Sequence, residues 1–367
     1  MKDLSVNHLT TWQFFLLATN YLIGPTYFVQ MSGLIGTTKQ WSWIPPILAF
    51  IMSLGVIWLW LHLLKRHPGK DLAEITVNLL GQKIGFVISL IFIYFFILIA
   101  SLATRNVGDV INTVAMDFTP TVVFNLLTIT VAIYVLSKGI RTLGRTVEIL
   151  TPLIFVIFWG SLLLVIGEWD TERLIPMPGS FDLKAIGSMT VSFFSFPYLE
   201  FLPILMLIPL TRNNKRTRKS VYLASTVTTV STIGVIFLLV GTIGCMRISN
   251  LTYPTMASAQ EISLFKTIEN LDVFVSSILI TTVLIKVSIL LYAAFIFIKC
   301  VFRFPYKTPI LFTLLFTTTA FSMGAHANIV ENIHYAKTLV PIYSVILGIF
   351  LPLLLLIISY VRKGVQS

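Results

Sequence analysis

Long runs of apolar residues constrain this chain more than any other feature of its sequence. A helix needs about 20 predominantly apolar residues to cross the hydrocarbon core of a bilayer, because each residue advances the helix by only about 1.5 Å. The chain contains about ten such runs, near residues 10–32, 42–64, 84–104, 120–137, 146–166, 186–210, 221–246, 273–298, 309–324 and 339–361. We therefore predict an all-α polytopic membrane protein that forms a single integral membrane domain over residues 1–367.

The composition excludes most soluble functions. Hydrophobic residues make up 56% of the chain and charged residues only 11%, whereas soluble domains are about 25% charged. The chain therefore lacks the polar surface of a soluble enzyme, and we expect no nucleic-acid partner despite the formal net charge of +11. Since the sequence contains neither a familiar catalytic motif nor a metal-ligand spacing, we expect no enzymatic activity, no cofactor and no metal.

The distribution of charge along the chain predicts its orientation. If both termini are cytoplasmic, the inner segments hold more than twice as many Lys and Arg residues as the outer segments, as the positive-inside rule requires. Most Asp and Glu residues fall in the outer segments. The net positive charge is therefore mainly a topology signal, and it favours an even number of spans with both ends in the cytoplasm.

Ten spans divide into two sets of five, at about residues 10–166 and 186–361. Because five is odd, the second set enters the membrane from the opposite side, so the repeat is necessarily inverted. Inverted repeats are common in secondary transporters, whose binding sites lie near the membrane midplane between discontinuous helices. We therefore predict a LeuT-like five-plus-five fold in which the first and sixth helices are broken.

Both of these spans contain a helix-breaking sequence near the middle. Glycine relaxes the backbone and proline removes a hydrogen-bond donor, and irregular backbone at membrane depth is tolerated only inside protein or around a cavity. A simple proline kink remains the alternative for either span. The residues concerned are Gly24, Pro25 and Thr26 in the first span and Phe196, Pro197 and Tyr198 in the sixth.

Two charged residues lie in the middle of predicted spans, Glu200 in span six and Lys286 in span eight. A charge at that depth costs about 2.5–3.5 kcal/mol on insertion scales, so such residues are rare and usually functional. We predict that one or both line a ligand or ion cavity. The alternative is a buried structural pair that locks spans six and eight together.

A resemblance to a known family follows from three groups of residues and their order. Ile23-Gly24-Pro25, the segment from Phe196 to Glu200, and Ile285-Lys286-Val287-Ser288 followed by Tyr292-Ala293-Ala294 resemble the endospore germination permease family. These proteins are the B subunits of spore germinant receptors and form a branch of the amino acid–polyamine–organocation transporter superfamily. The similarity covers essentially the whole chain.

The resemblance implies a protein of the spore inner membrane that binds a small nutrient germinant, often an amino acid, between spans one, three, six and eight. It implies a lipid bilayer as surroundings and, as partners, a membrane-embedded A-type subunit and a lipoprotein C-type subunit. Family roles carry over to Gly24, Pro25 and Thr26 as backbone donors for a ligand carboxylate, to Phe196, Pro197 and Tyr198 as the facing break, and to Tyr94 and Lys286.

Transporters of this plan hold a coupling sodium between span eight and the break in span one. Lys286 is placed to supply that positive charge permanently, with Thr282 one turn away on the same helix face. Tyr94 in span three is either a ligand contact or a hydrogen-bonding link between helices.

Three functions fit these residues. The leading prediction is a germinant-sensing receptor subunit with a transporter fold. The second is an amino acid/proton symporter with Glu200 as the proton carrier. The third is a structural assembly subunit that binds no ligand.

Overall fold

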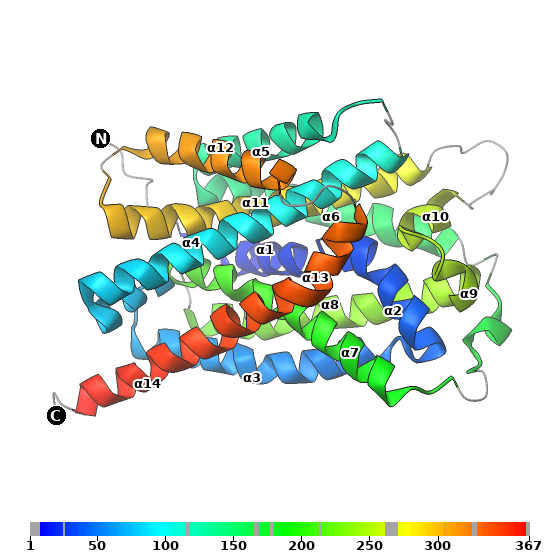
Figure 1. The fold of residues 1–367 in the computed structure, drawn as a ribbon, viewed down its shortest axis with the longest axis horizontal. Helices are drawn as coiled ribbons and strands as arrows, with labels where there is room; N and C mark the ends of the chain where they lie inside the picture. Colours follow the sequence, from blue (N-terminus) through cyan, green and yellow to red (C-terminus); the bar gives the residue numbers. More distant parts are fainter. Residues whose placement is uncertain are drawn as a thin grey trace.

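The computed structural model describes residues 8–24, 26–114, 118–164, 167, 169–176, 180–212, 214–260, 271–304, 306–324 and 329–364. These residues form long helices that run mainly along the longest axis of the molecule (Figure 1). The predicted all-helical architecture is confirmed, because an isolated bridge between Leu9 and Thr211 is the one β pairing that the described residues contain.

The helices are α1 (Thr11–Ile23), η1 (Thr26–Gln30), α2 (Met31–Thr38), η2 (Lys39–Trp41), α3 (Ile44–Arg66), α4 (Leu72–Val114), α5 (Thr121–Lys138), α6 (Ile140–Leu164), η4 (Thr171–Leu174), α7 (Leu183–Phe193), η5 (Phe194–Tyr198), η6 (Leu199–Leu210), α8 (Asn214–Thr242), α9 (Cys245–Ile248), α10 (Pro254–Gln260), α11 (Leu271–Phe302), α12 (Lys307–Gly324), α13 (Ile329–Val345), η7 (Ile346–Phe350) and α14 (Leu351–Gly364).

Eight helical stretches of the described chain are long and apolar enough to cross a membrane. They are Ile44–Arg66, Leu72–Asn112, Thr121–Lys138, Ile140–Gly160, Leu183–Leu210, Lys215–Thr242, Val275–Phe302 and Thr338–Arg362. The first predicted span is divided among α1, η1 and α2, and the ninth corresponds to α12, which has 18 residues and is rich in threonine. The total of ten spans therefore stays a prediction.

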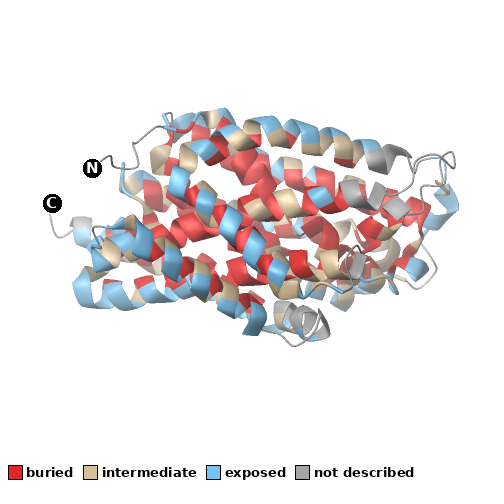
Figure 2. Cartoon of the chain, turned by 90° about the horizontal axis from the view of Figure 1, so that it is seen from above, coloured by how far each residue is buried: buried red, intermediate tan, exposed pale blue. Residues whose placement is uncertain are grey.

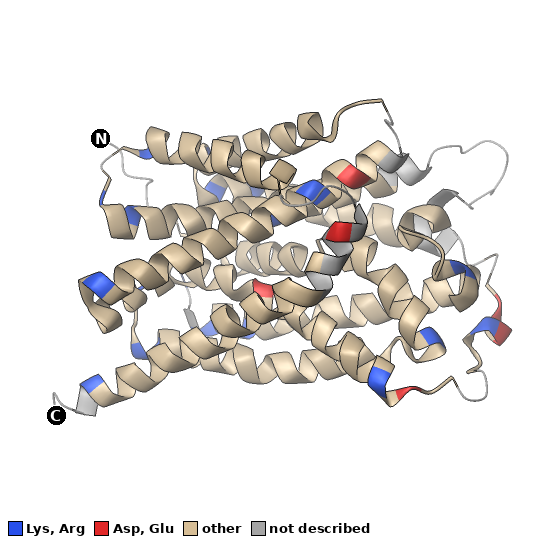
Figure 3. Cartoon of the chain, viewed as in Figure 1, with Lys and Arg blue, Asp and Glu red and all other residues tan. Residues whose placement is uncertain are grey.

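Burial and charge follow the pattern of a protein surrounded by lipid. Buried residues run through the middle of the bundle, while exposed ones lie on its outer helices (Figure 2). Many of the exposed residues are large and apolar, such as Leu127 on α5 and Phe316 on α12. Acidic residues appear at the end where α2, α7 and α9 lie, and Lys and Arg prevail at the opposite end (Figure 3). This asymmetry agrees with the predicted orientation but leaves the side of the termini a prediction.

The first span breaks at Gly24. Helix α1 begins with a capping box in which Thr10 and Gln13 satisfy each other's backbone N–H groups. It ends at Ile23, where Gly24 leaves the helical region with φ 13° and ψ −126°. The chain then resumes as the π-helical turn η1 and continues into α2. The predicted break in span one is therefore present; Pro25 lies outside the described residues.

The sixth span breaks at Phe196. Helix α7 runs into the π-helical turn η5, within which Phe196 has the extended values φ −125° and ψ 113°. The following η6 is a 3-10 helix of 12 residues with Pro203 and Pro209 inside it. Such runs rarely exceed about four residues, and each of the two prolines in this one removes a backbone hydrogen-bond donor.

Hydrogen bonds join the two breaks to each other and to the rest of the bundle. The Tyr21 hydroxyl on α1 donates to the backbone oxygen of Glu200 at 2.6 Å, which links span one to span six. At the far side of the first break, the Thr255 hydroxyl on α10 donates to the backbone oxygen of Tyr27 at 2.5 Å. Two backbone oxygens near the helix breaks thus accept hydrogen bonds from neighbouring side chains, as buried polar groups require.

Candidate ligand-binding site

A cavity of about 450 Å³ lies next to both helix breaks. This volume falls within the range of about 300–1,000 Å³ that is usual for small-molecule sites. Its walls come from η1 and α2, from α4, from α7 with η5, and from the segment that follows α9. The apolar lining residues include Leu34, Ile99, Leu102, Ala103, Met189, Phe193 and Val340.

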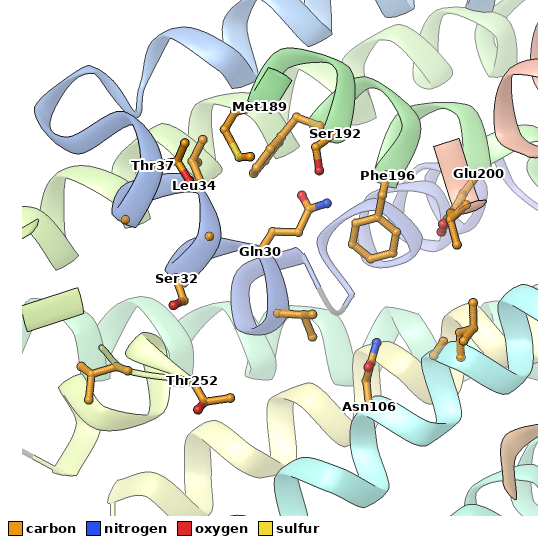
Figure 4. A pocket seen from close by; sticks show the side chains of 18 of the residues that line it. Gln30, Ser32, Leu34, Thr37, Asn106, Met189, Ser192, Phe196, Glu200 and Thr252 are labelled. Carbon is orange, nitrogen blue, oxygen red and sulfur yellow. The ribbon is translucent and has the colours of Figure 1, made fainter. Parts of the chain in front are cut away.

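Uncharged polar side chains line much of the remaining wall. Figure 4 shows the Gln30 amide reaching across the cavity towards Ser192 on α7, with Phe196 standing between Gln30 and Glu200. The Oε1 atom of Gln30 is buried and has no hydrogen-bond partner among the described residues. The polar lining residues without charge are Gln30, Ser32, Thr37, Asn106, Ser192, Ser249, Asn250 and Thr252.

The two predicted intramembrane charges meet at one end of this cavity. The Lys286 ammonium donates to Oε2 of Glu200 at 2.7 Å. The Lys286 side chain is fully buried and that of Glu200 is 2% exposed. Both residues line the cavity. Their contact also links spans six and eight, so the structure agrees with the predicted cavity position and with the structural alternative alike.

Two aromatic rings lie close to the ammonium, and the first helix break lies beside the stem of Lys286. The Lys286 Nζ atom lies 4.4 Å from the centre of the Phe196 ring and 5.2 Å from that of Tyr21, within the distance of a cation–π interaction. A Cβ atom added to Gly24 would stand 3.6 Å from Cδ of Lys286. The stem of Lys286 therefore passes directly beside the break in span one.

Coulomb attraction across 2.7 Å amounts to about 6 kcal/mol at an effective dielectric constant near 20. Removing two charges from water costs several kcal/mol per ion, so a buried pair stabilises a fold little in net terms. Each partner nevertheless depends on the other, because a single buried charge is far more costly than a compensated pair. A charged ligand group that binds Glu200 or Lys286 would consequently compete with the contact between them.

The structure brings only some of the predicted site residues to the cavity. Phe196, Glu200 and Lys286 line it, and Gly24 abuts the stem of Lys286. The hydroxyl of Thr282 is buried one turn from Lys286 but donates to backbone oxygens of its own helix, and it is not part of the cavity wall.

Three further residues of the two breaks are buried outside the lining. The Thr26 hydroxyl donates to the backbone oxygen of Leu22 at 2.9 Å. Tyr198 points to α8, where its hydroxyl lies 2.5 Å from Oγ1 of Thr229. Pro197 is buried beside it without lining the cavity, and the predicted role of Pro25 falls on a residue outside the described chain.

Tyr94 lies on a different face of α4 from the cavity. Its side chain is 43% exposed and packs edge-on against Phe321 of α12. Because successive helical residues are about 100° apart, the lining residues Ile99, Ala103 and Asn106 project well away from Tyr94. Span three contributes to the cavity as predicted, but through these residues.

The sequence did contain a signal for some of the residues that the prediction missed. Gln30 and Asn106 are amides within or close to predicted spans, and polar side chains at such depth usually face the protein interior. Ser192 lies one helical turn before Phe196, on the same face of span six. The contribution of residues 249–252 carried no such signal, because it depends on how the segment after α9 folds back over α2.

Comparison with known proteins identifies the family of this chain. A family model described as "Spore germination protein" matches residues 8–330. The chain belongs to this spore germination family. The resemblance inferred from the three groups of residues is thereby confirmed.

The similarity extends over almost the full length of individual relatives. The chain is 22% identical to Spore germination protein KB of Bacillus subtilis (strain 168) over 354 residues. This alignment covers 96% of this chain and 94% of that protein. Membership of the family and the apolar helices together make the chain an integral membrane protein of the spore inner membrane.

Solved structures confirm the LeuT-like fold. The crystal structure of MhsT in complex with L-phenylalanine superimposes with a TM-score of 0.67 at 14% identity, covering 94% of this chain and 97% of that chain. A Na⁺-coupled sialic acid symporter in a substrate-bound outward-open state gives a TM-score of 0.64 at 12% identity, covering 93% and 77%. At such low identity these similarities concern the fold alone.

Proposed function

We propose that this protein is the germinant-sensing subunit of a spore germination receptor. It binds a small nutrient, such as an amino acid, in the cavity beside the two helix breaks. Binding changes the arrangement of the broken helices, and A-type and C-type receptor subunits transmit that change as the signal for germination. The protein performs no chemistry on the nutrient and needs no metal or cofactor.

The observation that carries this proposal is the position of the cavity. A pocket large enough for a small molecule ends on a buried ion pair that joins span six to span eight. Ligand groups that reach this pair act on both spans at once, so binding energy is available to shift the equilibrium between helix arrangements. A purely structural subunit has no need of a cavity at this place.

An amino acid/proton symporter is the second candidate, because transporters share the fold. In that function Glu200 takes up and releases a proton in each cycle. The contact with Lys286 at 2.7 Å disfavours this role, because a neutral Glu200 would leave the buried ammonium without a counter-ion. We therefore rank sensing ahead of proton-coupled transport.

The test of sensing uses a variant that fills the cavity. Leu102→Trp places a large side chain in the cavity wall, whereas Leu127→Trp makes the same change on a side chain that is 58% exposed on α5. Spores that contain Leu102→Trp at the wild-type protein level are expected to lose the nutrient response, and spores with Leu127→Trp are expected to retain it. A normal response of the Leu102→Trp spores would overturn the proposal.

Two further measurements separate the alternatives. Accumulation of radiolabelled nutrient in proteoliposomes, driven by a proton gradient, would support the symporter. Co-purification of A-type and C-type subunits with Leu102→Trp, combined with loss of direct nutrient binding, would assign the defect to sensing. Loss of those subunits from the preparation would instead favour the structural assembly role.

A further inference from the structure

The cavity carries no net charge in the part of the chain that the structure describes. Its charged lining residues are Glu200 and Lys286, and they neutralise each other. A ligand with a net charge would lose its hydration without meeting a free counter-charge, which is strongly unfavourable. The cavity is therefore suited to a ligand whose own charges sum to zero.

Two groups beside the cavity have unused hydrogen-bonding capacity. An ammonium can donate three hydrogen bonds, and among the described residues Lys286 donates one, to Glu200, and otherwise faces the rings of Phe196 and Tyr21. The buried Oε1 atom of Gln30 accepts none. The site thus offers a free donor near one end and a free acceptor on the wall.

We propose that the cavity binds a zwitterionic amino acid by exchanging partners with the Glu200–Lys286 pair. The ligand carboxylate takes the Lys286 ammonium, and the ligand ammonium takes Glu200 and Oε1 of Gln30. The Phe196 ring, which separates Gln30 from Glu200 (Figure 4), moves aside to admit the charged head. This inference rests on the proposed function and adds to it the selection of the ligand and the event that binding triggers.

Partner exchange explains why both charges are required. A cationic ligand can satisfy Glu200 but leaves Lys286 buried without a counter-ion, and an anionic ligand leaves Glu200 in that state. An uncharged ligand can replace neither partner, so the pair stays closed. A zwitterion supplies both replacements at once and keeps every buried charge compensated.

The exchange also changes how two helices are connected. Glu200 belongs to η6 and Lys286 to α11, and their bond joins these elements directly. When each residue binds the ligand instead, the link between span six and span eight passes through the ligand. The state with the opened pair is thus the one that the ligand stabilises, which is the requirement for a ligand-driven shift between conformations.

The first experiment varies the charge of the probe. The purified full chain in nanodiscs is screened by thermal shift with the proteinogenic amino acids, glucose and inosine. The amino acid with the largest effect is then compared by calorimetry with its primary amide, a cation, and its N-acetyl derivative, an anion. Since each derivative leaves one buried charge unpaired, we expect both to bind at least about 100-fold more weakly.

Each result of this screen supports or overturns the inference. The inference is overturned if either derivative binds with the same affinity as the parent amino acid. Binding of glucose or inosine without binding of any amino acid also overturns it, while leaving the proposed nutrient-sensing function intact. If no probe binds, although spores respond to one of these nutrients through this chain, the cavity is not the sensing site and both proposals fail.

The second experiment removes both charges together. Glu200→Gln with Lys286→Met leaves no unpaired buried charge, and we expect it to bind the amino acid at least about 100-fold more weakly. Arg105→Met with Asp109→Asn is the matched control, because that ion pair of 2.8 Å, with side chains 11% exposed, lies outside the cavity lining. Wild-type affinity of the first double variant would show that the pair only locks the helices together. The derivative series on the wild-type chain decides the matter if this variant does not fold.

Discussion

Replacing either member of the Glu200–Lys286 pair alone is expected to destabilise the protein severely. Lys286→Met leaves the Glu200 carboxylate without a counter-ion at a site where the side chain is only 2% exposed, and Glu200→Gln leaves the fully buried ammonium in the same condition. Breaking a buried pair in this way typically costs about 3–5 kcal/mol. The penalty comes from the charge that remains, and so the two single variants are expected to lose similar stability.

The double variant Glu200→Gln with Lys286→Met provides the quantitative test. Because the attraction of about 6 kcal/mol at an effective dielectric near 20 is largely offset by the desolvation of two ions, removing both charges is expected to be nearly neutral. Replacement of buried pairs by well-packed hydrophobic residues of similar volume is often neutral or stabilising by about 1–4 kcal/mol. The double variant should therefore recover most of the stability that each single variant loses.

The assay is thermal unfolding of wild type, both single variants and the double variant in the same nanodisc preparation. The expected order of midpoints is wild type and double variant together, with both single variants several degrees below. Additive losses in the double variant would refute the reasoning, because they would mean that the two side chains contribute independently. Single variants as stable as the wild type would refute it too, because a buried charge without a counter-ion lowers the stability of the fold.

Three further predictions concern other parts of the molecule. Tyr21→Phe removes the donor to the backbone oxygen of Glu200 and should cost about 1–3 kcal/mol, because it leaves a buried carbonyl unsatisfied; an unchanged unfolding midpoint would contradict this. If the Lys286 ammonium replaces a coupling sodium, nutrient binding to the wild type should be unchanged when potassium replaces sodium, and a normal, sodium-independent response in Lys286→Met would exclude that role. Burial raises the pKa of Asp71, before the first turn of α4, to about 6. An acid whose pKa is higher in the folded than in the unfolded state stabilises the fold at pH values below its unfolded-state pKa. This contribution to the free energy of unfolding is lost as the pH rises towards 6, and it amounts to at most about 3 kcal/mol before solvent screening. Asp71→Asn, which preserves the helix cap, should therefore raise the unfolding midpoint more at pH 8 than at pH 4; an equal effect at both would contradict the assignment.

The helix breaks were the most informative local signal. Gly24 and Phe196 both leave helical geometry in the structure, and the sequence predicts this because glycine and proline act on the backbone of their own neighbourhood. Glu200 and Lys286 were equally predictable as interior residues, since the cost of an intramembrane charge applies whatever the tertiary packing. Local chemistry was sufficient for these conclusions.

The identity of the cavity-facing residues was much less predictable. In span three the prediction named Tyr94 and not Asn106, yet Asn106 lines the cavity and Tyr94 is 43% exposed. In a soluble helix the polar side marks the exposed face, but a membrane helix is apolar towards lipid and towards protein alike. Without that contrast, hydropathy shows that a helix spans the membrane and leaves its rotation undetermined.

The sequence by itself thus determined the class of protein, the family, the two breaks and the two charges that must be buried, because each follows from the cost of placing particular groups in hydrocarbon. Only the tertiary structure decided that Glu200 and Lys286, 86 positions apart, form one contact, and that Phe196 stands between this contact and the rest of the cavity. Such contacts depend on the depth and rotation at which separate helices pack. Those quantities are set by the complementary shapes of many side chains together, and no local pattern along the chain encodes them.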